Sequence, residues 1–309
     1  MCCVMPKSLI SAILIMLFGI LAFDLMGILV RMLGGSYSIL QISSLRNFFG
    51  VVPPLFLLWR YRQFDILPAL NKPRFHAILL GRSLAVLLAQ FCFYTALTKI
   101  EFATTSALGF TGPLFITALS VPLLGHHVGL WRWAAIVVGF VGMLTVLKPF
   151  DEAFSVYMIY PVIAAFGYAC SSLLVRFYPK EIPSAAIQLS QQICTFVLAS
   201  VVLLSFSEWT PISSPNDAVL FLLVGVFGGT GVMCLVTAYR LVDPSSISPF
   251  EYFGIPISFA LGWLFFAEAP YDDLFPGILF IILAGLIIIH RERQANRSVT
   301  VGKVAKLDK

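Results

Sequence analysis

Ten apolar stretches, each long enough to cross a lipid bilayer, occupy most of this 309-residue chain. The hydrocarbon core of a bilayer is about 30 Å thick, so a helix with a rise of 1.5 Å per residue needs about 20 apolar residues to span it. Hydrophobic residues make up 59% of the chain and charged residues only 11%, more apolar surface than a soluble core could bury. Runs such as Ala134–Leu147 lack the alternation of barrel strands, so the sequence predicts an all-α integral membrane protein.

The predicted topology has ten transmembrane helices joined by short loops, with no soluble domain between them. We place the spans at Ser8–Val30, Ile39–Trp59, Phe75–Leu97, Thr104–Leu124, Trp131–Leu147, Ser155–Val175, Ala185–Ser205, Ala218–Tyr239, Ser245–Phe266 and Leu274–His290.

The distribution of Lys and Arg predicts the orientation of the chain. With the N-terminus inside, 15 basic residues lie on the cytoplasmic side and three on the other, while Arg46 and Arg82 fall within spans. Cytoplasmic loops carry the excess of basic residues, so both termini are predicted to be cytoplasmic in a multi-pass protein of the cytoplasmic (inner) membrane. The basic residues of 291–309 then form a solvated cytoplasmic tail that faces the lipid surface, with no indication of nucleic-acid binding.

Cysteine and histidine positions indicate neither a disulfide framework nor a metal site. Four of the six cysteines lie within predicted spans, and the histidines fall at helix ends without metal-ligand spacing. No phosphate-binding loop is present, and no acid, base and nucleophile cluster together. The sequence therefore predicts no cofactor, no metal and no catalytic residue.

A weak internal repeat divides the chain at an offset of 142 to 145 residues. Pro113 corresponds to Pro256, Gly142 to Gly285, and the Leu-Val-Arg sequence ending at Arg31 to the one ending at Arg176. Five spans per repeat is an odd number, so the repeats, 8–148 and 155–290, must have opposite orientations in the membrane. Such inverted 5+5 repeats enclose a binding site near the bilayer midplane, which predicts a transporter.

Several motifs around this repeat are similar to a known family. They are Arg46-Asn47-Phe48-Phe49, Gly81-Arg82-Ser83-Leu84, Phe93-Tyr94-Thr95-Ala96-Leu97, Pro113-Leu114-Phe115, Ser248-Pro249-Phe250-Glu251-Tyr252, and Gly262-Trp263 followed by Glu268 and Pro270. Together they resemble the drug/metabolite transporters of the EamA-domain family, and most of all the bacterial branch of S-adenosylmethionine and riboflavin carriers. His126 departs from the pattern, because the family often carries Glu there. The resemblance implies ten helices in two inverted repeats and a central cavity lined by spans 1, 3, 4, 6, 8 and 9.

Four ionisable residues lie inside predicted spans, where a charge is costly and usually faces a cavity or a partner. Helical rise places Asp24 and Arg46 at one depth, and Arg82 and Glu251 at another. We predict two ion pairs, Asp24 with Arg46 and Arg82 with Glu251. In this hypothesis Arg46 has a structural role, while Asp24, Arg82 and Glu251 contact substrate. The alternative is that all four only fix the register of the helices.

Further candidates for substrate binding are aromatic or uncharged polar residues within spans. Aromatic rings can stack on a planar ligand or surround a cation, and polar groups can position it. Helix packing and interhelical hydrogen bonding are the alternative roles. The candidates are Gln90, Tyr94, Phe110, Thr111, Tyr168, Tyr239 and Tyr252.

Prolines and glycines predict where helices bend and where they approach closely. Pro113 and Pro256 are expected to bend spans four and nine and to leave backbone carbonyls facing a cavity. The glycines at 225, 228, 229 and 231 suit close helix packing better than a phosphate site, since no strand precedes them.

The function that these patterns favour is secondary transport of a small organic metabolite by alternating access. The sequence leaves the substrate open among S-adenosylmethionine-, riboflavin- and amino-acid-like compounds. It also leaves open whether transport is coupled to a proton or a counter-substrate, and whether the protein is a monomer or a homodimer. An integral-membrane enzyme and a channel are the rival functions, but neither a catalytic cluster nor repeated filter loops are present.

Overall fold

The structure, a computed structural model, describes residues 7–62, 73–124, 130–147, 155–212, 214–242, 247–268, 275–280, 282–284 and 286–287. The predicted basic tail 291–309, His126 and most of the loops on either side of span five lie outside this part. The elements with assigned bounds are α1 (Lys7–Leu33), α2 (Ile39–Phe49), α3 (Val52–Tyr61), α5 (Pro73–Lys99), α6 (Phe102–Gly109), α7 (Gly112–Leu124), α8 (Leu130–Leu147), η1 (Val156–Met158), α9 (Ile159–Leu174), η2 (Val175–Phe177), α10 (Ser184–Phe206), α11 (Pro215–Leu241), η3 (Ser248–Phe253) and α13 (Gly254–Phe266).

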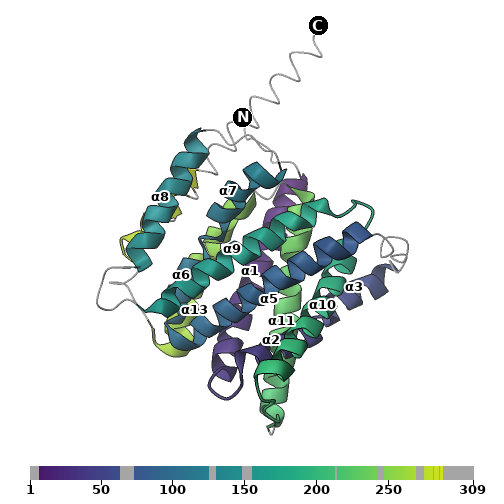
Figure 1. Cartoon of the computed structure of the whole chain (residues 1–309). Helices are drawn as coiled ribbons and strands as arrows, with labels where there is room; N and C mark the ends of the chain where they lie inside the picture. Colours follow the sequence, from purple (N-terminus) through teal and green to yellow (C-terminus); the bar gives the residue numbers. More distant parts are fainter. Residues whose placement is uncertain are drawn as a thin grey trace.

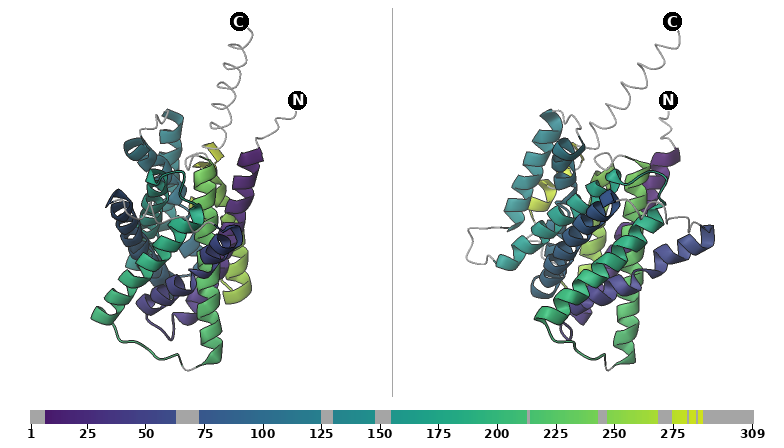
Figure 2. Two further views of the ribbon diagram at one scale, coloured as in Figure 1. Left: turned by 90° about the vertical axis from the view of Figure 1, so that its right-hand side faces the viewer. Right: turned by 45° about the vertical axis from the view of Figure 1, so that its right-hand side comes forward.

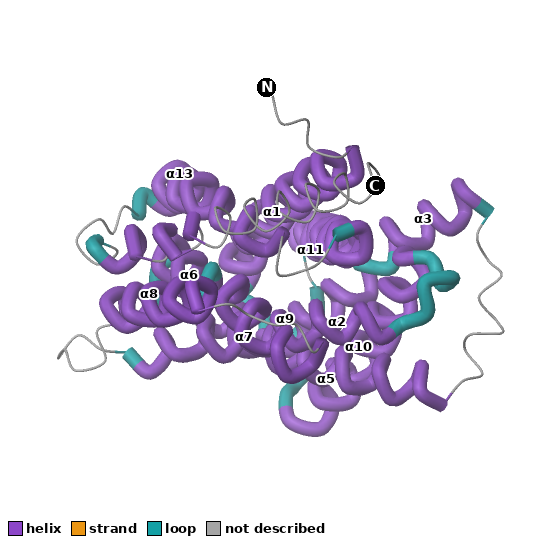
Figure 3. The backbone as a smooth tube through the Cα atoms, turned by 90° about the horizontal axis from the view of Figure 1, so that it is seen from above, coloured by secondary structure: helices purple, strands orange, loops and turns teal. Residues whose placement is uncertain are grey.

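These helices form one bundle, and no strand occurs among the residues that the structure describes. Helix α11 packs along α1. Helix α5 packs along α9 and crosses α11 obliquely (Figure 1). Helices α8 and α3 lie at opposite edges of the bundle, and the two further views keep them apart (Figure 2). Seen from above, α1 and α11 lie side by side, with α9 and α5 on one side of the bundle and α13 beside α1 (Figure 3).

Within the described part of the chain, seven helical segments are long and apolar enough to cross a membrane. They correspond to predicted spans one to four and six to eight. Span five contributes the shorter apolar helix Ile136–Val146, and span nine contributes Gly254–Phe266. Large apolar side chains such as Leu14, Val201 and Leu204 are exposed on the outside of the bundle, as expected where helices face lipid. The chain is therefore a multi-pass helical membrane protein.

Two predicted spans are broken where prolines follow. Span four consists of α6 and α7, separated at Phe110 and Thr111 just before Pro113. Span nine changes from η3 to α13 between Phe253 and Gly254, just before Pro256. Proline cannot donate a backbone hydrogen bond and its ring clashes with the preceding turn, so a helix tends to end or bend there. Both spans are thus interrupted beside the prolines that were expected to bend them, while the cavity-facing carbonyls stay a prediction.

The glycines of α11 allow its backbone to touch the α2–α3 junction. A Cβ atom on Gly225 would lie 2.2 Å from Cβ of Phe49, and one on Gly229 would lie 2.4 Å from the carbonyl oxygen of Gly50. Any side chain at these positions would force the helices apart. The prediction that these glycines serve close helix packing is confirmed.

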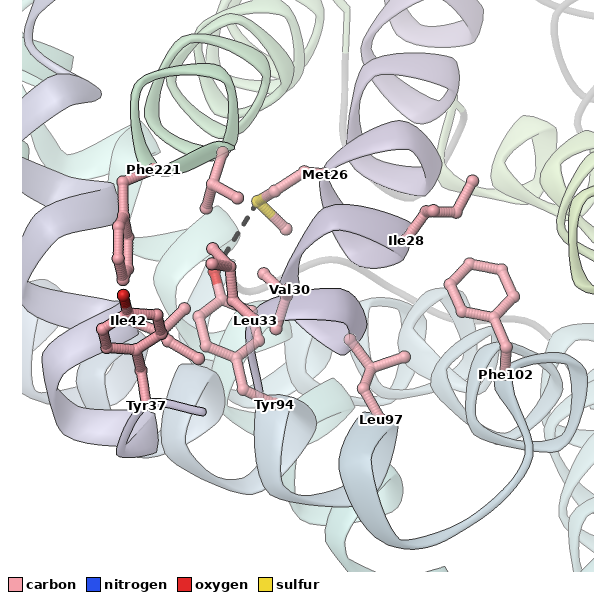
Figure 4. Packing of buried hydrophobic residues seen from close by; sticks show 11 residues of the cluster. Met26, Ile28, Val30, Leu33, Tyr37, Ile42, Tyr94, Leu97, Phe102 and Phe221 are labelled. Atoms are coloured by element: carbon pink, nitrogen blue, oxygen red, sulfur yellow. Dashed lines mark hydrogen bonds between the residues drawn. The ribbon is translucent and has the colours of Figure 1, made fainter. Parts of the chain in front are cut away.

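Packing at one end of α1 forms a large apolar cluster. Met26, Tyr94, Leu97, Phe102 and Phe221 are all buried in it, from α1, α5, α6 and α11. The side chains converge in Figure 4, where the Tyr94 hydroxyl donates to Sδ of Met26 at 3.6 Å. This cluster joins the first helix to elements from both halves of the chain and closes the region next to the candidate site.

Candidate functional site

A cavity of about 190 Å³ lies inside the bundle. It is far larger than the space of about 10–15 Å³ that a single water molecule needs. The cavity is lined by α1, α5, the broken span α6–α7, α9, α11 and η3, which are the spans 1, 3, 4, 6, 8 and 9 that the family resemblance implies. Six of the candidate residues line it: Asp24, Arg82, Phe110, Tyr168, Tyr239 and Glu251.

Asp24 and Arg82 are the two buried charged residues of this lining that retain an unpartnered polar atom. Asp24 is 8% exposed and Arg82 1%. Oδ2 of Asp24 and Nη1 of Arg82 have no hydrogen-bond partner within the described residues. Nε of Arg82 donates to the carbonyl oxygen of Ser171 at 3.1 Å and to its hydroxyl at 3.2 Å, which ties α5 to α9. A buried polar atom without a partner is costly, so both groups can gain from a ligand.

Glu251 is held differently, because the hydroxyl of Tyr239 donates a hydrogen bond to its Oε1. Tyr239 belongs to α11 and Glu251 to η3, so this bond crosses the loop between spans eight and nine. The second carboxylate oxygen, Oε2, lies 3.9 Å from where a Cβ on Gly112 would be. The carboxyl group therefore sits beside the break in span four.

Neither predicted ion pair is present. Within the described part of the chain the single ion pair joins Arg31 and Glu268. Arg46 donates hydrogen bonds to neutral acceptors and not to Asp24. Arg82 donates to Ser171, and Glu251 accepts from Tyr239. Matching depths alone misled the prediction, because helices at the same depth need not be neighbours. The substrate-binding roles of Asp24, Arg82 and Glu251 stay predictions.

Arg46 belongs to a buried polar network between α2, α10 and α11, away from the cavity lining. Nη1 donates at 2.9 Å to Oδ1 of Asn47 and to Oε1 of Gln192, and Nη2 donates at 2.9 Å to the carbonyl oxygen of Gly228. The predicted structural role thus fits the geometry, but the predicted carboxylate partner was wrong. Neutral acceptors thus take both terminal nitrogens of this guanidinium, while its Nε has no partner within the described residues.

Three other candidates, Gln90, Tyr94 and Thr111, do not line the cavity. Gln90 accepts hydrogen bonds from Ser43 and Asn47, and Tyr94 donates to Met26. The Thr111 hydroxyl donates to the carbonyl oxygen of Leu108 at 2.7 Å, within the break of span four. All three side chains therefore contact other protein groups, as expected if their role is in helix packing and not in substrate binding. Tyr252 lies in η3, but its side chain is outside the described residues.

The two helix breaks contact each other beside the cavity. A Cβ atom on Gly254 would lie 2.6 Å from Cζ of Phe110 and 2.7 Å from Cγ2 of Ile20. Phe110 and Gly254 are separated by 144 positions, which lies within the offset of the internal repeat. The ring of Phe110 therefore occupies space that only a glycine at 254 leaves open.

A polar clasp, formed by Arg31 and Glu268, lies next to a cavity-lining residue. The guanidinium of Arg31 on α1 donates two hydrogen bonds to the carboxylate of Glu268, and its Cζ lies 4.5 Å from the ring centre of Phe266. Oε2 of Glu268 also accepts the backbone N–H of Phe102 at 2.8 Å, at the start of α6. A carboxylate at a helix N-terminus is favourable because unpaired N–H groups point toward it. Phe102 itself lines the cavity, so the clasp joins α1, α6 and α13 next to it.

Sequence reasoning missed the clasp and several lining residues. Arg31 and Glu268 are 237 positions apart, and each falls at a span end where a charge is ordinary. Ser106, Ser171 and Ser172 also line the cavity. Serines in membrane helices commonly bond their own backbone, so their presence in the sequence carries no specific signal.

Comparison with known proteins agrees with this geometry. The profile of the EamA-like transporter family matches residues 10–148 and again residues 155–290. The chain belongs to the EamA-like transporter family. It is therefore a membrane transporter and not an enzyme.

Its relatives carry metabolites. The S-adenosylmethionine uptake transporter of Rickettsia prowazekii is 24% identical over 94% of this chain and 97% of that protein. The S-adenosylmethionine uptake transporter of Rickettsia felis is 31% identical over 64% of this chain and 67% of that protein. The riboflavin transporter of Vibrio cholerae is 30% identical over 62% of this chain and 63% of that protein. A protein of known crystal structure shares the fold, with a TM-score of 0.71 and 15% identity over 92% of this chain and 98% of that one.

Proposed function

We propose that this transporter moves a small organic metabolite, of the S-adenosylmethionine, riboflavin or amino-acid type, across the cytoplasmic membrane by alternating access. The observation that carries the proposal is a cavity lined by six spans, two of them broken beside it. Two buried charged residues, Asp24 and Arg82, and the partly buried Glu251 belong to its lining. Broken helices around a central site are typical of secondary transporters. The names of the relatives supply the substrate types.

The architecture proposed for this function is ten helices in two inverted repeats, 8–148 and 155–290, with both termini in the cytoplasm. The two profile matches, 10–148 and 155–290, support it. So does the position of the two helix breaks at equivalent places in spans four and nine. Asp24, Arg82, Phe110, Tyr168, Tyr239 and Glu251 form the proposed substrate site.

In this orientation the Arg31–Glu268 clasp is at the outer end of the bundle and closes it. Alternating access then requires this ion pair to break when the cavity opens outward. An ion pair that is partly exposed contributes about 0–1 kcal/mol, so it can stabilise one state without locking it. Glu251 is the proposed site for a coupled proton, since a carboxyl group within the cavity lining can change protonation as access changes.

Uptake and counterflow in proteoliposomes test the function. Purified protein is reconstituted, loaded with unlabelled S-adenosylmethionine or riboflavin, and exposed to the labelled compound outside. We expect saturable uptake with transient accumulation driven by the internal solute. Flux that is not saturable and shows no counterflow would indicate a channel, and chemical conversion of the solute would indicate an enzyme.

A further inference from the structure

We propose that the cavity selects a ligand that carries both a cationic group and a carboxylate, with Asp24 contacting the cation and Arg82 contacting the carboxylate. The inference rests on the proposed function and narrows its substrate class. It excludes a neutral ring system such as riboflavin as the preferred substrate.

The first step is that two oppositely charged residues of the cavity lining, Asp24 and Arg82, form no ion pair with each other, while Glu251, the other acidic residue of the lining, is held by Tyr239. Asp24 on α1 and Arg82 on α5 both line the cavity, and both are more than nine-tenths buried. Ion pairs within 4.0 Å in the described part of the chain do not include either residue. A ligand with one charge of each sign can contact both groups, whereas a ligand with a single charge leaves one unpaired in a low-dielectric site.

The second step is that each residue keeps hydrogen-bonding capacity after its protein contacts are made. Arg82 uses Nε for Ser171, while its Nη1 has no partner among the described residues. Oδ2 of Asp24 is likewise unpartnered there. Arg46, equally buried, uses both of its terminal nitrogens on protein acceptors and does not line the cavity. Arg82 is therefore the arginine that can still bind a carboxylate, because its planar guanidinium can donate two parallel hydrogen bonds to the two carboxylate oxygens.

The third step concerns the aromatic residues of the lining. Phe23, Phe93 and Phe102 line the cavity in addition to Phe110, Tyr168 and Tyr239. Aromatic faces attract cations and stack on planar rings, so they favour a ligand that carries a cation and a planar ring. The occupant that satisfies all of these groups is an organic zwitterion or cation with a carboxylate and a planar ring.

The test is competition binding to the full chain in lipid nanodiscs, with labelled S-adenosylmethionine as the probe. That compound has a sulfonium, an ammonium, a carboxylate and a planar base. Three competitors each lack part of this pattern. S-adenosylhomocysteine keeps the ammonium and the carboxylate but lacks the sulfonium charge, the cation that Asp24 is expected to contact; decarboxylated S-adenosylmethionine lacks the carboxylate, and riboflavin lacks all of these charges. We expect each competitor to bind about ten- to a hundredfold more weakly than the probe, as the loss of a charged hydrogen bond predicts.

Two variants then assign each preference to a residue. Asp24→Asn should abolish the preference for the probe over S-adenosylhomocysteine and leave the preference over the decarboxylated compound. Arg82→Gln should do the reverse, and Arg82→Lys, which keeps the charge without the fork, should retain part of the carboxylate preference. Ser83→Ala is the matched control, because Ser83 is buried on α5 beside Arg82 but does not line the cavity. It should keep both preferences.

The outcomes separate this inference from the proposed function. Riboflavin binding as tightly as the probe, or both preferences surviving in Asp24→Asn and Arg82→Gln, overturns the inference while carrier activity stands. A folded protein that neither binds nor moves any solute of the panel overturns both.

Discussion

The aromatic ring of Phe110 fills the space above Gly254, so the break in span four and the start of α13 are in direct contact. Phe110 lies three positions before Pro113, and Gly254 lies two positions before Pro256. The ring of Phe110, from the first half of the chain, packs on the backbone of Gly254, from the second half. Side-chain size at 254 is therefore expected to control the fit of the two halves.

Gly254→Ala should destabilise the protein by about 1–3 kcal/mol, the cost of overpacking a filled site. The new Cβ would lie 2.6 Å from Cζ of Phe110. The measurement is the thermal unfolding midpoint in detergent. Gly81→Ala is the control, because a Cβ there has nothing within 4 Å, and alanine is the better helix former. Equal midpoints for Gly254→Ala and wild type would contradict the prediction, and Phe110→Leu should restore stability in the double variant.

Glu268→Gln should increase access to the cavity from outside the cell. The substitution removes the charge that holds Arg31 and weakens the bond to the Phe102 N–H. A cysteine placed at the cavity-lining position 106, in a chain whose own cysteines are replaced, reports access to a membrane-impermeant maleimide. Labelling should be severalfold faster in Glu268→Gln than in Glu208→Gln, which alters an exposed carboxylate. Equal rates would remove the clasp from the gating mechanism.

Glu251→Gln should uncouple transport from a proton gradient while leaving counterflow. The amide keeps the hydrogen-bond acceptor for Tyr239 but can no longer take up a proton. Uptake is measured with and without an imposed pH gradient. Tyr239→Phe removes the hydrogen bond and keeps the carboxyl group, so it should remain sensitive to the gradient. Gradient-driven uptake unchanged in Glu251→Gln would exclude this residue as the proton site.

Arg46→Met should lower stability by about 1–3 kcal/mol, as expected when buried neutral acceptors are left without a hydrogen-bond donor. Asn47, Gln192 and Gly228 would lose their donors. Substrate KM should not change, because Arg46 does not line the cavity. Arg60→Met, at an exposed position, is the control for thermal unfolding. A raised KM with unchanged stability would place Arg46 in the substrate site instead.

Tyr37→Phe should flatten the alkaline end of the stability profile. The Tyr37 hydroxyl donates to Oδ2 of Asp217 at 2.8 Å, and this bond raises the pKa of Tyr37 in the folded state. A raised folded pKa means that the stabilisation is complete below the unfolded pKa of about 10 and is lost as pH rises through the folded value. Thermal midpoints across this pH range should fall less in Tyr37→Phe than in wild type. Parallel profiles would contradict the assignment.

Hydrophobic runs were enough to predict an all-helical membrane protein, because the bilayer fixes helix length and direction before any tertiary contact forms. Seven of the predicted spans agree with described helices within a few residues. Prolines 113 and 256 predicted the breaks for an equally local reason. Partners of the buried charges were not predictable in this way. Arg46 and Gln192, or Tyr239 and Glu251, meet through the rotation of each helix about its axis, which a weakly patterned apolar helix does not reveal.

The contact between Gly229 and Gly50 has a mechanical consequence. Where two main chains touch without intervening side chains, sliding by even one residue brings a bulky neighbour into the gap, and Gln192 further bridges to the Gly50 carbonyl oxygen at 3.3 Å. Helices α2, α10 and α11 are thereby fastened into a unit that shifts only as a whole. In the proposed alternating access, we expect the movement to be absorbed where the chain is already interrupted, at the breaks in spans four and nine.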